Sequence, residues 1–523
     1  MKRRDFLAAA ALPVLTGCEA PAEIAGGFTG INFERGHLLR DRRSWPAPAS
    51  TQRTGVVIAG GGVAGLAAAR ALRQRGIEDF ALLELEDQAG GNSRGGAVNG
   101  VPCPLGAHYL PVPGDDAREV QDLLEEFGLR QRVAGRWRYD ERHLCHSPQE
   151  RLFFNGAWQD GLLPLQGVEP ETLAQYRRFA QGVARAGWFA IPVSKVSLAQ
   201  VDPALDAMTF GAWLDLQQLT DPHLRWYLDY CCRDDYGAGI ATVSAWAGLH
   251  YFASRHGFHA PGDGVAESEG VLTWPEGNAW LTRRLAAPLG GRQHTGQVVA
   301  RIAVGRHGVE VDAFDAATST LRRWQADHCI VALPLFVAAR LVENPPPALR
   351  EAAAQLRYAP WLVANVHLRA PLDDRPGAAP SWDNVVYDSR PGAEGLGYVD
   401  AMHQSLLPVP GATVLTCYRA LGLAPARRQV LFDEPWTHWR DVLWAEFAAP
   451  HPDLPAKATR IDITRYGHAM STPVPGIRRS AALAALQSRA AGQRLWFAHS
   501  DLSGYSIFEE ALTHGHRVGS RVG

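Results

Sequence analysis

A glycine-rich turn that joins a short apolar run to a helical run constrains the fold of this chain more than any other feature. Residues 55–59 are mostly apolar and rich in β-branched side chains, which is typical of a buried strand. Gly60, Gly62 and Gly65 follow at GxGxxG spacing, and residues 66–75 are rich in Ala, Leu and Arg, which favour a helix. Strand, glycine turn and helix in this order predict the start of a dinucleotide-binding βαβ unit.

Each glycine of the turn has its own physical reason. Gly60 permits the tight turn, Gly62 lacks a Cβ and lets the backbone approach a pyrophosphate, and Gly65 lets the helix pack closely on the strand. The free N–H groups at the start of the helix would then face the phosphates. Residues 80–85 predict a second strand, and its Glu84 lies where an acidic side chain hydrogen-bonds a ribose hydroxyl. A glycine-rich turn in an ordinary α/β domain is the alternative.

The segment after Glu84 narrows the choice of dinucleotide. A glycine pair, Gly90 and Gly91, begins six residues after that acid. This pattern resembles the FAD-binding start of the flavin-containing amine oxidase superfamily, which includes monoamine and polyamine oxidases, L-amino-acid oxidases and phytoene-type desaturases. In the family an Arg follows the pair at once, whereas here Asn92 takes that place and Arg94 comes two residues later. The resemblance implies FAD as the cofactor, with Gly91 in its site and Arg94 as the candidate phosphate contact.

The C-terminal region carries the second strong resemblance. Residues 494–501 resemble the family's Phe-Ala-Gly-Asp/Glu motif, in which the acid hydrogen-bonds the ribityl chain of FAD; this implies that role for Asp501. His499 replaces the usual Gly. The segment that begins at Glu509 resembles the family's closing helix, whose N-terminus faces the flavin, so Glu509 is a further candidate cofactor-binding residue. Glu510 stands where the family has a small Gly.

Two weaker resemblances lie between these ends. Residues 297–302 predict a strand, and the backbone of a Val in the corresponding family strand holds the adenine, which implies Val298 or Val299, with Val298 taken first. A small-residue turn before residue 109 lies beside the flavin in the family. His108 in this turn is therefore a candidate acid/base near the ring, with a hydrogen-bonded structural histidine as the alternative.

Residues 356–369 look like the family strand that crosses under the flavin. Amine oxidases commonly carry a Lys on this strand, linked through a water to flavin N5, and a rough alignment places Asn365 there. The missing Lys favours a dehydrogenase or desaturase that uses an electron acceptor other than oxygen. Tyr505, between the two C-terminal motifs, is a candidate for one wall of an aromatic sandwich around the substrate. The lysines of the chain are Lys2, Lys195 and Lys457.

Residues 111–265 read as mainly helical and contain many aromatic side chains. These could line a pocket for an apolar substrate, with a packed helical core as the alternative. Asp234 and Asp235 follow a predicted helix over residues 222–232 and could form a paired-carboxylate site, with a solvated turn as the alternative. The aromatic residues are Trp213, Trp226, Tyr227, Tyr230, Tyr236, Trp246, Tyr251 and Phe252.

A chain of 523 residues is too long for one small domain. The order of the motifs predicts an α/β fold, with a doubly wound, Rossmann-like FAD-binding domain and a mixed α+β substrate domain inserted in segments. The FAD-binding domain is expected over residues 54–110, 270–345 and 480–523, and the substrate domain over 111–269 and 346–479.

Residues 1–18 predict a targeting segment. Arg3 and Arg4 begin a stretch that resembles the twin-arginine export motif, and the apolar run that follows is too short to span a bilayer. The end of the segment resembles a lipobox, in which Cys18 would be lipidated. We therefore expect a lipid-anchored lipoprotein on the periplasmic side of a bacterial cell envelope, with residues 19–53 as a tether that could pack partly on the body of the protein. A plain signal peptide with a chance cysteine is the alternative.

The predicted function is FAD-dependent oxidation of a C–H bond next to an amine, by hydride transfer to flavin N5. A small-molecule substrate and an electron acceptor, oxygen or another, are implied. The net charge of −2 argues against a nucleic-acid partner, and no metal-ligand spacing is present among the cysteines. No cysteine lies in the closing motif, so we expect FAD to be bound noncovalently.

Two other functions are compatible with the same motifs. One is an FAD-dependent desaturase or dehydrogenase that acts on an apolar substrate and uses an acceptor other than oxygen, which the missing Lys and the anchor favour. The other is a non-catalytic flavin-binding redox protein, which would be favoured if His499 and Glu510 block the flavin ring.

Overall fold

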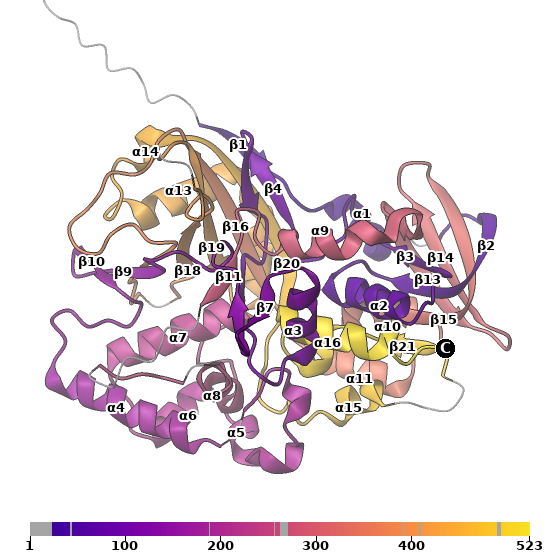
Figure 1. Cartoon of the computed structure of the whole chain (residues 1–523), viewed down its shortest axis with the longest axis horizontal. Helices are drawn as coiled ribbons and strands as arrows, with labels where there is room; N and C mark the ends of the chain where they lie inside the picture. The colour runs from indigo at the N-terminus through magenta and orange to yellow at the C-terminus, as the bar shows by residue number, and fades with distance from the viewer. Residues whose placement is uncertain are drawn as a thin grey trace, which may run out of the picture.

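The computed structural model places two large sheets next to each other, with helices packed on their faces (Figure 1). The predicted export signal, with Cys18, lies outside the described residues, as does the start of the predicted tether. The described residues are 24–41, 44–187, 189–255, 257–261, 270–390, 392–406, 409–488 and 493–523.

The first sheet has seven strands, of which the central ones are parallel. In spatial order they are β12 (Gln293–His294), β3 (Phe80–Leu83), β2 (Pro48–Ala59), β15 (Thr320–Val331), β14 (Val309–Asp315) and β13 (Gln297–Val304), with β21 (Leu495–Phe497) beside β15. Because β2 pairs in parallel with both β3 and β15, segments that are far apart in the sequence build one sheet.

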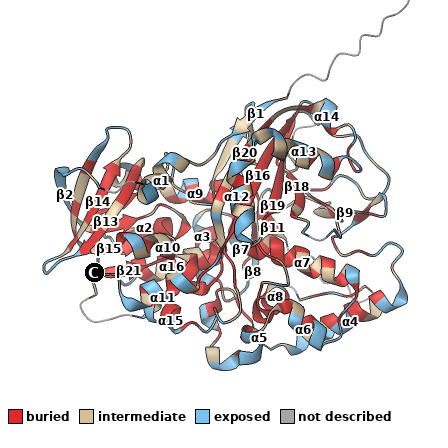
Figure 2. Cartoon of the chain, turned by 180° about the vertical axis from the view of Figure 1, so that it is seen from behind, coloured by how far each residue is buried: buried red, intermediate tan, exposed pale blue. Residues whose placement is uncertain are grey.

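Successive residues of a strand point to opposite faces of the sheet, so a strand that is apolar throughout presents apolar side chains on both faces. Helices cover both faces of this sheet. Val56 and Ile58 pack on one helical layer, and Val57 and Ala59 pack on the other. The first layer contains α2 (Val63–Gln74), α3 (Arg118–Glu126), α9 (Ala279–Ala286) and α16 (Phe508–Gly519); the second contains α10 (Leu335–Leu341), α11 (Pro347–Gln355) and α15 (Ala481–Gln487). The strands between the two layers are largely buried (Figure 2). This arrangement confirms the predicted α/β fold class.

The second sheet has eight strands and is mostly antiparallel. In spatial order they are β1 (Ala25–Phe28), β20 (Ala458–Ser471), β16 (Tyr358–Leu368), β19 (Thr413–Ala420), β18 (Gly395–Asp400), β17 (Asp383–Val386), β9 (Glu150–Phe154) and β10 (Ala157–Asp160). Every residue of β16 is buried, because helices cover this sheet on both faces as well.

The larger helical layer on the second sheet holds the aromatic residues noted in the sequence. Most of the eight belong to its buried core, Tyr227 and Tyr251 pack against that core, and none lines the large cavity described below. A packed core is therefore the correct interpretation. The layer contains α4 (Pro170–Arg185), α5 (Pro203–Ala207), α6 (Phe210–Leu216), α7 (Pro222–Tyr236) and α8 (Ala245–Ala253); α12 (Pro425–Asp433), α13 (Trp436–Phe447) and α14 (Leu454–Lys457) cover the other face.

The described part of the predicted tether packs on the rest of the protein, as the prediction allowed. Residues 25–28 form β1, which pairs in parallel with β20, and α1 (Phe33–Asp41) follows. Residues 48–53 belong to β2, which begins before Gly55. The Gly-, Ala- and Pro-rich composition conceals β1, because this strand obtains its hydrogen bonds from a partner that lies more than 400 residues away in the sequence.

The cysteines in the described part of the chain are all free, and all but Cys145 are buried. This favours buried thiols over a disulfide framework. Among the described residues, we find no helix whose length and apolar character would let it cross a bilayer.

Candidate functional site

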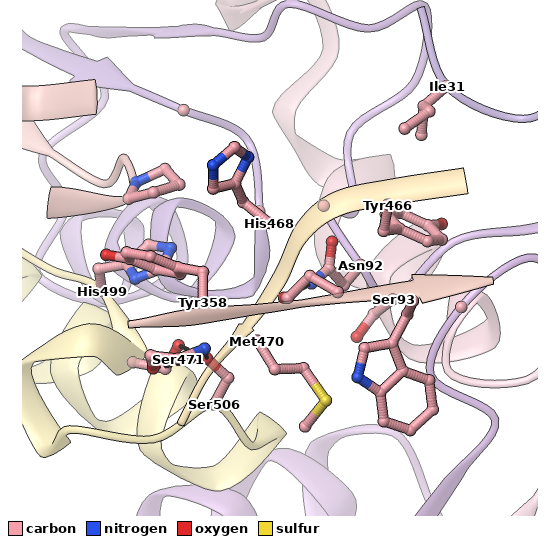
Figure 3. A pocket seen from close by; sticks show the side chains of 18 of the residues that line it. Ile31, Asn92, Ser93, Tyr358, Tyr466, His468, Met470, Ser471, His499 and Ser506 are labelled. Atoms are coloured by element: carbon pink, nitrogen blue, oxygen red, sulfur yellow. Dashed lines mark hydrogen bonds between the residues drawn. The ribbon is translucent and has the colours of Figure 1, made fainter. Parts of the chain in front are cut away.

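A cavity of about 1090 Å³ is lined by residues of both sheets. It opens at the carboxyl ends of the parallel strands of the first sheet, where ligands of doubly wound folds bind. The segments that follow β2, β3, β15 and β21 all contribute to its wall. Figure 3 shows a second part of the wall, in which Tyr358 of β16 and Tyr466, His468 and Met470 of β20 lie around the same space.

The glycine turn between β2 and α2 has the geometry that close approach to a ligand requires. Gly60 has a φ of +104°, which only glycine adopts readily. A Cβ on Gly65 would lie 1.9 Å from the carbonyl oxygen of Gly60, so only glycine fits there. Gly62 is the N-cap of α2, and a Cβ on it would meet nothing closer than Gly91 Cα at 3.8 Å. The space beside Gly62 is therefore open to the cavity.

Glu84 lies at the end of β3 and faces the same turn. Its Oε2 accepts a hydrogen bond from the amide of Gly61 (2.8 Å), and its Oε1 accepts one from the amide of Glu86 (2.8 Å). Burial raises the pKa of this carboxyl, and the two amide donors oppose that rise. The carboxylate is thus held rigidly at the cavity wall, where its remaining lone pairs can accept from a ligand hydroxyl.

Gly91 and Arg94 also line the cavity. Arg94 donates to the carbonyl oxygen of Gly91 (3.1 Å) and to that of Gly30 (2.7 Å), and its Nη1 lies 3.6 Å from a carboxylate oxygen of Glu86. The guanidinium therefore joins the glycine pair to the N-terminal segment, and its contact with a phosphate stays a prediction.

Asp501 offers an acceptor that the protein leaves unused. Its Oδ2 accepts from the amide of Leu335 (2.9 Å) and from the hydroxyl of Tyr358 (2.5 Å). Its Oδ1 is buried and accepts no hydrogen bond, and its nearest polar neighbour is Nδ1 of His499 at 3.2 Å. Burial acts to raise the pKa, but His499, Tyr358 and the amide of Leu335 outweigh it and hold the pKa below its usual value. A buried, ionised acceptor at the wall suits a hydroxyl-bearing ligand, such as the ribityl chain of FAD.

Val298 does not face the cavity, which corrects its assignment as the adenine contact. Val298 packs in a small cluster with Phe314 and Leu321, whereas Val299 lines the cavity. The predicted contact is made by the backbone, and of the two candidates only Val299 lies at the cavity wall. Val299, the second candidate, therefore stays the prediction for the adenine contact.

Asn365 is also misplaced by the alignment. The residues of β16 that line the cavity are Tyr358, Trp361 and Val363. Asn365 is fully buried beyond them, and its Oδ1 accepts from the hydroxyl of Thr416 (2.8 Å). Asn365 lies two residues past Val363 on the same face of the strand, beyond the part of β16 that reaches the cavity. The described residues that line the cavity include no lysine.

Tyr505 does not line the cavity and cannot form a wall around the substrate there. It is buried, and its hydroxyl donates to Oε1 of Glu510 (2.9 Å). Glu510 also accepts from the amide of Val193 (2.7 Å) and from the hydroxyl of Ser503 (2.6 Å), and it too is absent from the cavity wall. Glu510 therefore does not project into the cavity, whereas His499 lines it.

His108 lines the cavity among other rings. It stacks on Tyr418 at a centroid distance of 4.5 Å and lies 5.5 Å from Trp382. Burial lowers its pKa to about 3, so the imidazole is neutral and weakly basic at physiological pH. This disfavours the predicted acid/base role and favours a role in packing against the ligand.

An acidic wall lies between α7 and α16, and the sequence indicated only part of it. Asp234 and Asp235 lie in the last turn of α7 rather than in a solvated turn, and both line the cavity with Glu509 and Arg255. Nη2 of Arg255 lies 3.4 Å from Oδ1 of Asp235. No sequence pattern singled out Arg255, because it stands alone in the segment after α8.

The acids of this wall are hard to ionise. Burial raises the pKa of Asp234 to about 7, helped by the neighbouring carboxylate of Asp235 and opposed by Arg255. Burial also raises the pKa of Glu509 to about 7, again opposed by Arg255. The wall therefore carries three carboxyl groups against one guanidinium.

The parts of the cavity fit a dinucleotide with a hydroxyl-rich chain. The turn at Gly62 leaves room for phosphates at the start of α2, Glu84 faces the ribose position, and Asp501 provides an unused buried acceptor. This fold and site define a Rossmann-type flavin-dependent oxidoreductase. Residues 63–405 match the family model of flavin containing amine oxidoreductases, and the chain belongs to this family.

Known relatives agree with this placement. The chain is 28% identical over 444 residues to the putative flavin-containing monoamine oxidase AofH of Mycobacterium tuberculosis. The aligned region covers 80% of this chain and 89% of that protein. It is 27% identical over 311 residues to an L-amino acid dehydrogenase of Synechocystis. That aligned region covers 57% of this chain and 60% of the dehydrogenase. Wild-type putrescine oxidase bound to putrescine shares the fold, with a TM-score of 0.66, 17% identity, and coverage of 90% of this chain and 99% of that one.

The chain is thus an FAD-dependent oxidoreductase of the amine oxidase type. When bound, FAD accepts a hydride from a substrate C–H bond. The chain's own residues bind and orient the cofactor and the substrate, and they exclude water from both.

Proposed function

We propose that this chain oxidises a small-molecule amine that enters as the ammonium ion and loses its N–H proton to a carboxylate of the cavity wall. The neutral amine then gives a hydride from the C–H bond next to the nitrogen to flavin N5, which leaves an iminium ion. The observation that supports this proposal is the acidic wall. Asp234, Asp235 and Glu509 face the cavity with Arg255 as their cationic neighbour. A second positive charge from the substrate would compensate the remaining carboxylates.

The rings beside the acidic wall complete a site for an alkyl ammonium group. His108, Trp361 and Tyr418 line the same cavity. Their apolar faces suit the carbon chain of an amine, and the faces of aromatic rings attract a cation. In this proposal Asp234 orients the ammonium group, while the rings hold the carbon to be oxidised and exclude water.

A second candidate is an amine dehydrogenase that passes its electrons to an acceptor other than oxygen. The observation that favours it is the lack of a lysine among the described residues of the cavity wall. Parallel assays of oxygen consumption and of dye reduction with the same amine separate the two candidates. The apolar-substrate alternative is disfavoured, because carboxylates line the cavity and most of the noted aromatic residues are packed in a core.

The test is anaerobic mixing of the purified full chain with a matched panel of substrates. A diamine, a monoamine and an L-amino acid are compared with an alcohol of the same carbon skeleton and with a polyene. We expect the visible flavin absorption to bleach with an amine and to persist with the alcohol and the polyene. Bleaching by the polyene alone would support the apolar alternative, and no bleaching with any compound would support a non-catalytic redox protein.

We also propose that the chain is exported by the twin-arginine route and anchored by lipid at Cys18, on the periplasmic side of a bacterial envelope. The paired arginines and the lipobox-like sequence support this proposal. Export of the folded protein suits an enzyme that acquires FAD before it crosses the membrane.

A further inference from the structure

Residues 24–41, here called the strap, lie against the cavity although they precede the nucleotide-binding motif in the sequence. Ile31, Phe33 and His37 are among the strap residues that line the cavity wall. The strap comprises β1, a short connection and α1. Figure 1 shows it leaving the second sheet at β1 and reaching the first sheet at α1, so that it crosses from one sheet to the other.

The strap is fixed at its first end by the second sheet. β1 pairs in parallel with residues 460–463 of β20. Gly30 follows with a φ of +96°, and a Cβ there would lie 2.3 Å from the hydroxyl oxygen of Thr464. This close approach shows that the strap is packed tightly and that its path over the cavity is determined by the fold.

At its second end, the strap is bonded to the segment that directly follows Glu84. The amide of Asn32 donates to Oε1 of Glu86 (3.0 Å). Nη1 of Arg35 donates to the carbonyl oxygen of Leu85 (3.1 Å) and to Oδ1 of Asp87 (2.7 Å). These bonds hold the strap over the part of the cavity where the ribose of a dinucleotide is expected.

An aromatic cluster joins the strap to the opposite wall. The rings of Phe33 in α1 and Phe432 in α12 meet edge to face at a centroid distance of 5.1 Å, and both residues line the cavity. The guanidinium of Arg465 lies 3.6 Å from the ring centroid of Phe28, 5.1 Å from that of Phe33 and 5.4 Å from that of Phe432. One cation thus holds three rings from β1, α1 and α12 together.

We propose that the strap is a cofactor-retaining element: it closes the nucleotide end of the cavity over the ADP half of FAD and slows FAD release. The described residues that line the cavity include no cysteine, and the retention proposed here is noncovalent. For FAD to leave past the strap, the contacts of Phe33 and Arg35 must first be broken. The proposal concerns cofactor binding alone and does not depend on the identity of the substrate.

The experiment measures FAD release from the purified full-length holoprotein in the absence of substrate. Phe33→Ala removes the edge-to-face contact, and Arg35→Ala removes the bonds to residues 85 and 87. Glu34→Ala is the matched control, because Glu34 is exposed in the same helix and does not line the cavity. Protein-bound FAD is followed by its visible absorbance after repeated dilution and ultrafiltration.

We expect Phe33→Ala and Arg35→Ala each to release FAD about tenfold faster than the wild type, since loss of ~1.4 kcal/mol corresponds to a factor of ten. Glu34→Ala should behave as the wild type. Equal release rates in all four proteins would overturn the proposal. If Phe33→Ala does not fold, Arg35→Ala decides alone, because this arginine is partly exposed and its ion-pair partner Asp87 is exposed.

Discussion

At the scale of single residues, Asp234 shows how burial gives an ordinary carboxyl group a function. Its pKa rises from 3.8 to about 7 because the end of α7 removes it from water, next to Asp235. A carboxyl with this pKa is half ionised near neutral pH. A cationic ligand would stabilise the ionised form, so amine binding and the ionisation of Asp234 should be coupled.

The first prediction concerns the pH dependence of catalysis. With an amine substrate, kcat/KM should rise as pH increases through about 7, because only the ionised carboxyls attract the ammonium group. Asp234→Asn should lower kcat/KM by about 100-fold, the effect of removing one partner of a buried charge pair. The double variant Asp234→Asn/Glu509→Gln should lose the rise near pH 7 altogether, and a rise that persists in it would contradict these roles.

The second prediction separates the two glycines of the turn. Gly65→Ala should fail to fold or unfold at a much lower temperature, because its Cβ would lie 1.9 Å from a backbone oxygen. Gly62→Ala should fold normally, because its Cβ meets only Gly91 Cα at 3.8 Å, yet it should bind FAD at least ~10-fold more weakly by filling the phosphate space. Thermal unfolding and FAD titration of the two variants check this, and normal FAD affinity in Gly62→Ala would be inconsistent with the assigned site.

At the scale of elements, α16 is held in place by a buried acid, Glu510. Glu510 accepts hydrogen bonds from Val193, Ser503 and Tyr505, so the closing helix, the turn before it and the helical layer are joined at one carboxylate. The sequence singled out this residue but did not indicate its role, because its partner Val193 lies more than 300 residues away.

The third prediction tests this role of Glu510. Glu510→Ala should destabilise the protein by about 3 kcal/mol, since it leaves the buried amide of Val193 and the buried hydroxyl of Tyr505 without their acceptor. Glu351→Ala, at an exposed position of α11, should change the stability by less than about 0.5 kcal/mol. Chemical denaturation of both variants provides the measurement, and equal stability of the two would argue against the role.

Elements whose signals are local could be predicted from the sequence. β2, α2 and β3 follow from an apolar run, a glycine turn and a helical composition that lie next to one another. β1 could not be predicted, because its composition is that of a linker and β20 provides its hydrogen bonds. The errors at Val298 and Asn365 have a related cause, since the register of a strand is set by its partner strands, which no local motif reveals.

At the scale of the whole molecule, two sheets from interleaved segments enclose one cavity, and the strap passes from one sheet to the other. Several of the predicted site residues lie at the wall of one cavity, among them Gly60, Gly62, Glu84 and Asp501. Arg255 could not be predicted, because only the packing of the helical layer brings it to Asp235. The chain's N-terminal segment therefore connects the proposed anchor directly with the cofactor site.

The fourth prediction concerns the location of the molecule. In a bacterial host with a twin-arginine pathway, the wild type should fractionate with membranes and be released by detergent. Cys18→Ala should remain exported but become soluble in the periplasm, because it lacks the lipid attachment. Replacement of Arg3 and Arg4 by Lys should retain the protein in the cytoplasm. Membrane association of Cys18→Ala equal to that of the wild type would contradict lipid anchoring at this residue.

The most direct test of the central claim is an anaerobic titration of the purified full chain with a diamine, followed at the visible flavin absorption. The account predicts a flavin spectrum in the purified protein and its progressive loss as the diamine is added, with Asp234→Asn requiring far more diamine for the same loss. A folded protein that shows no flavin absorption and takes up no added FAD, or a bound flavin that no amine reduces, would contradict it.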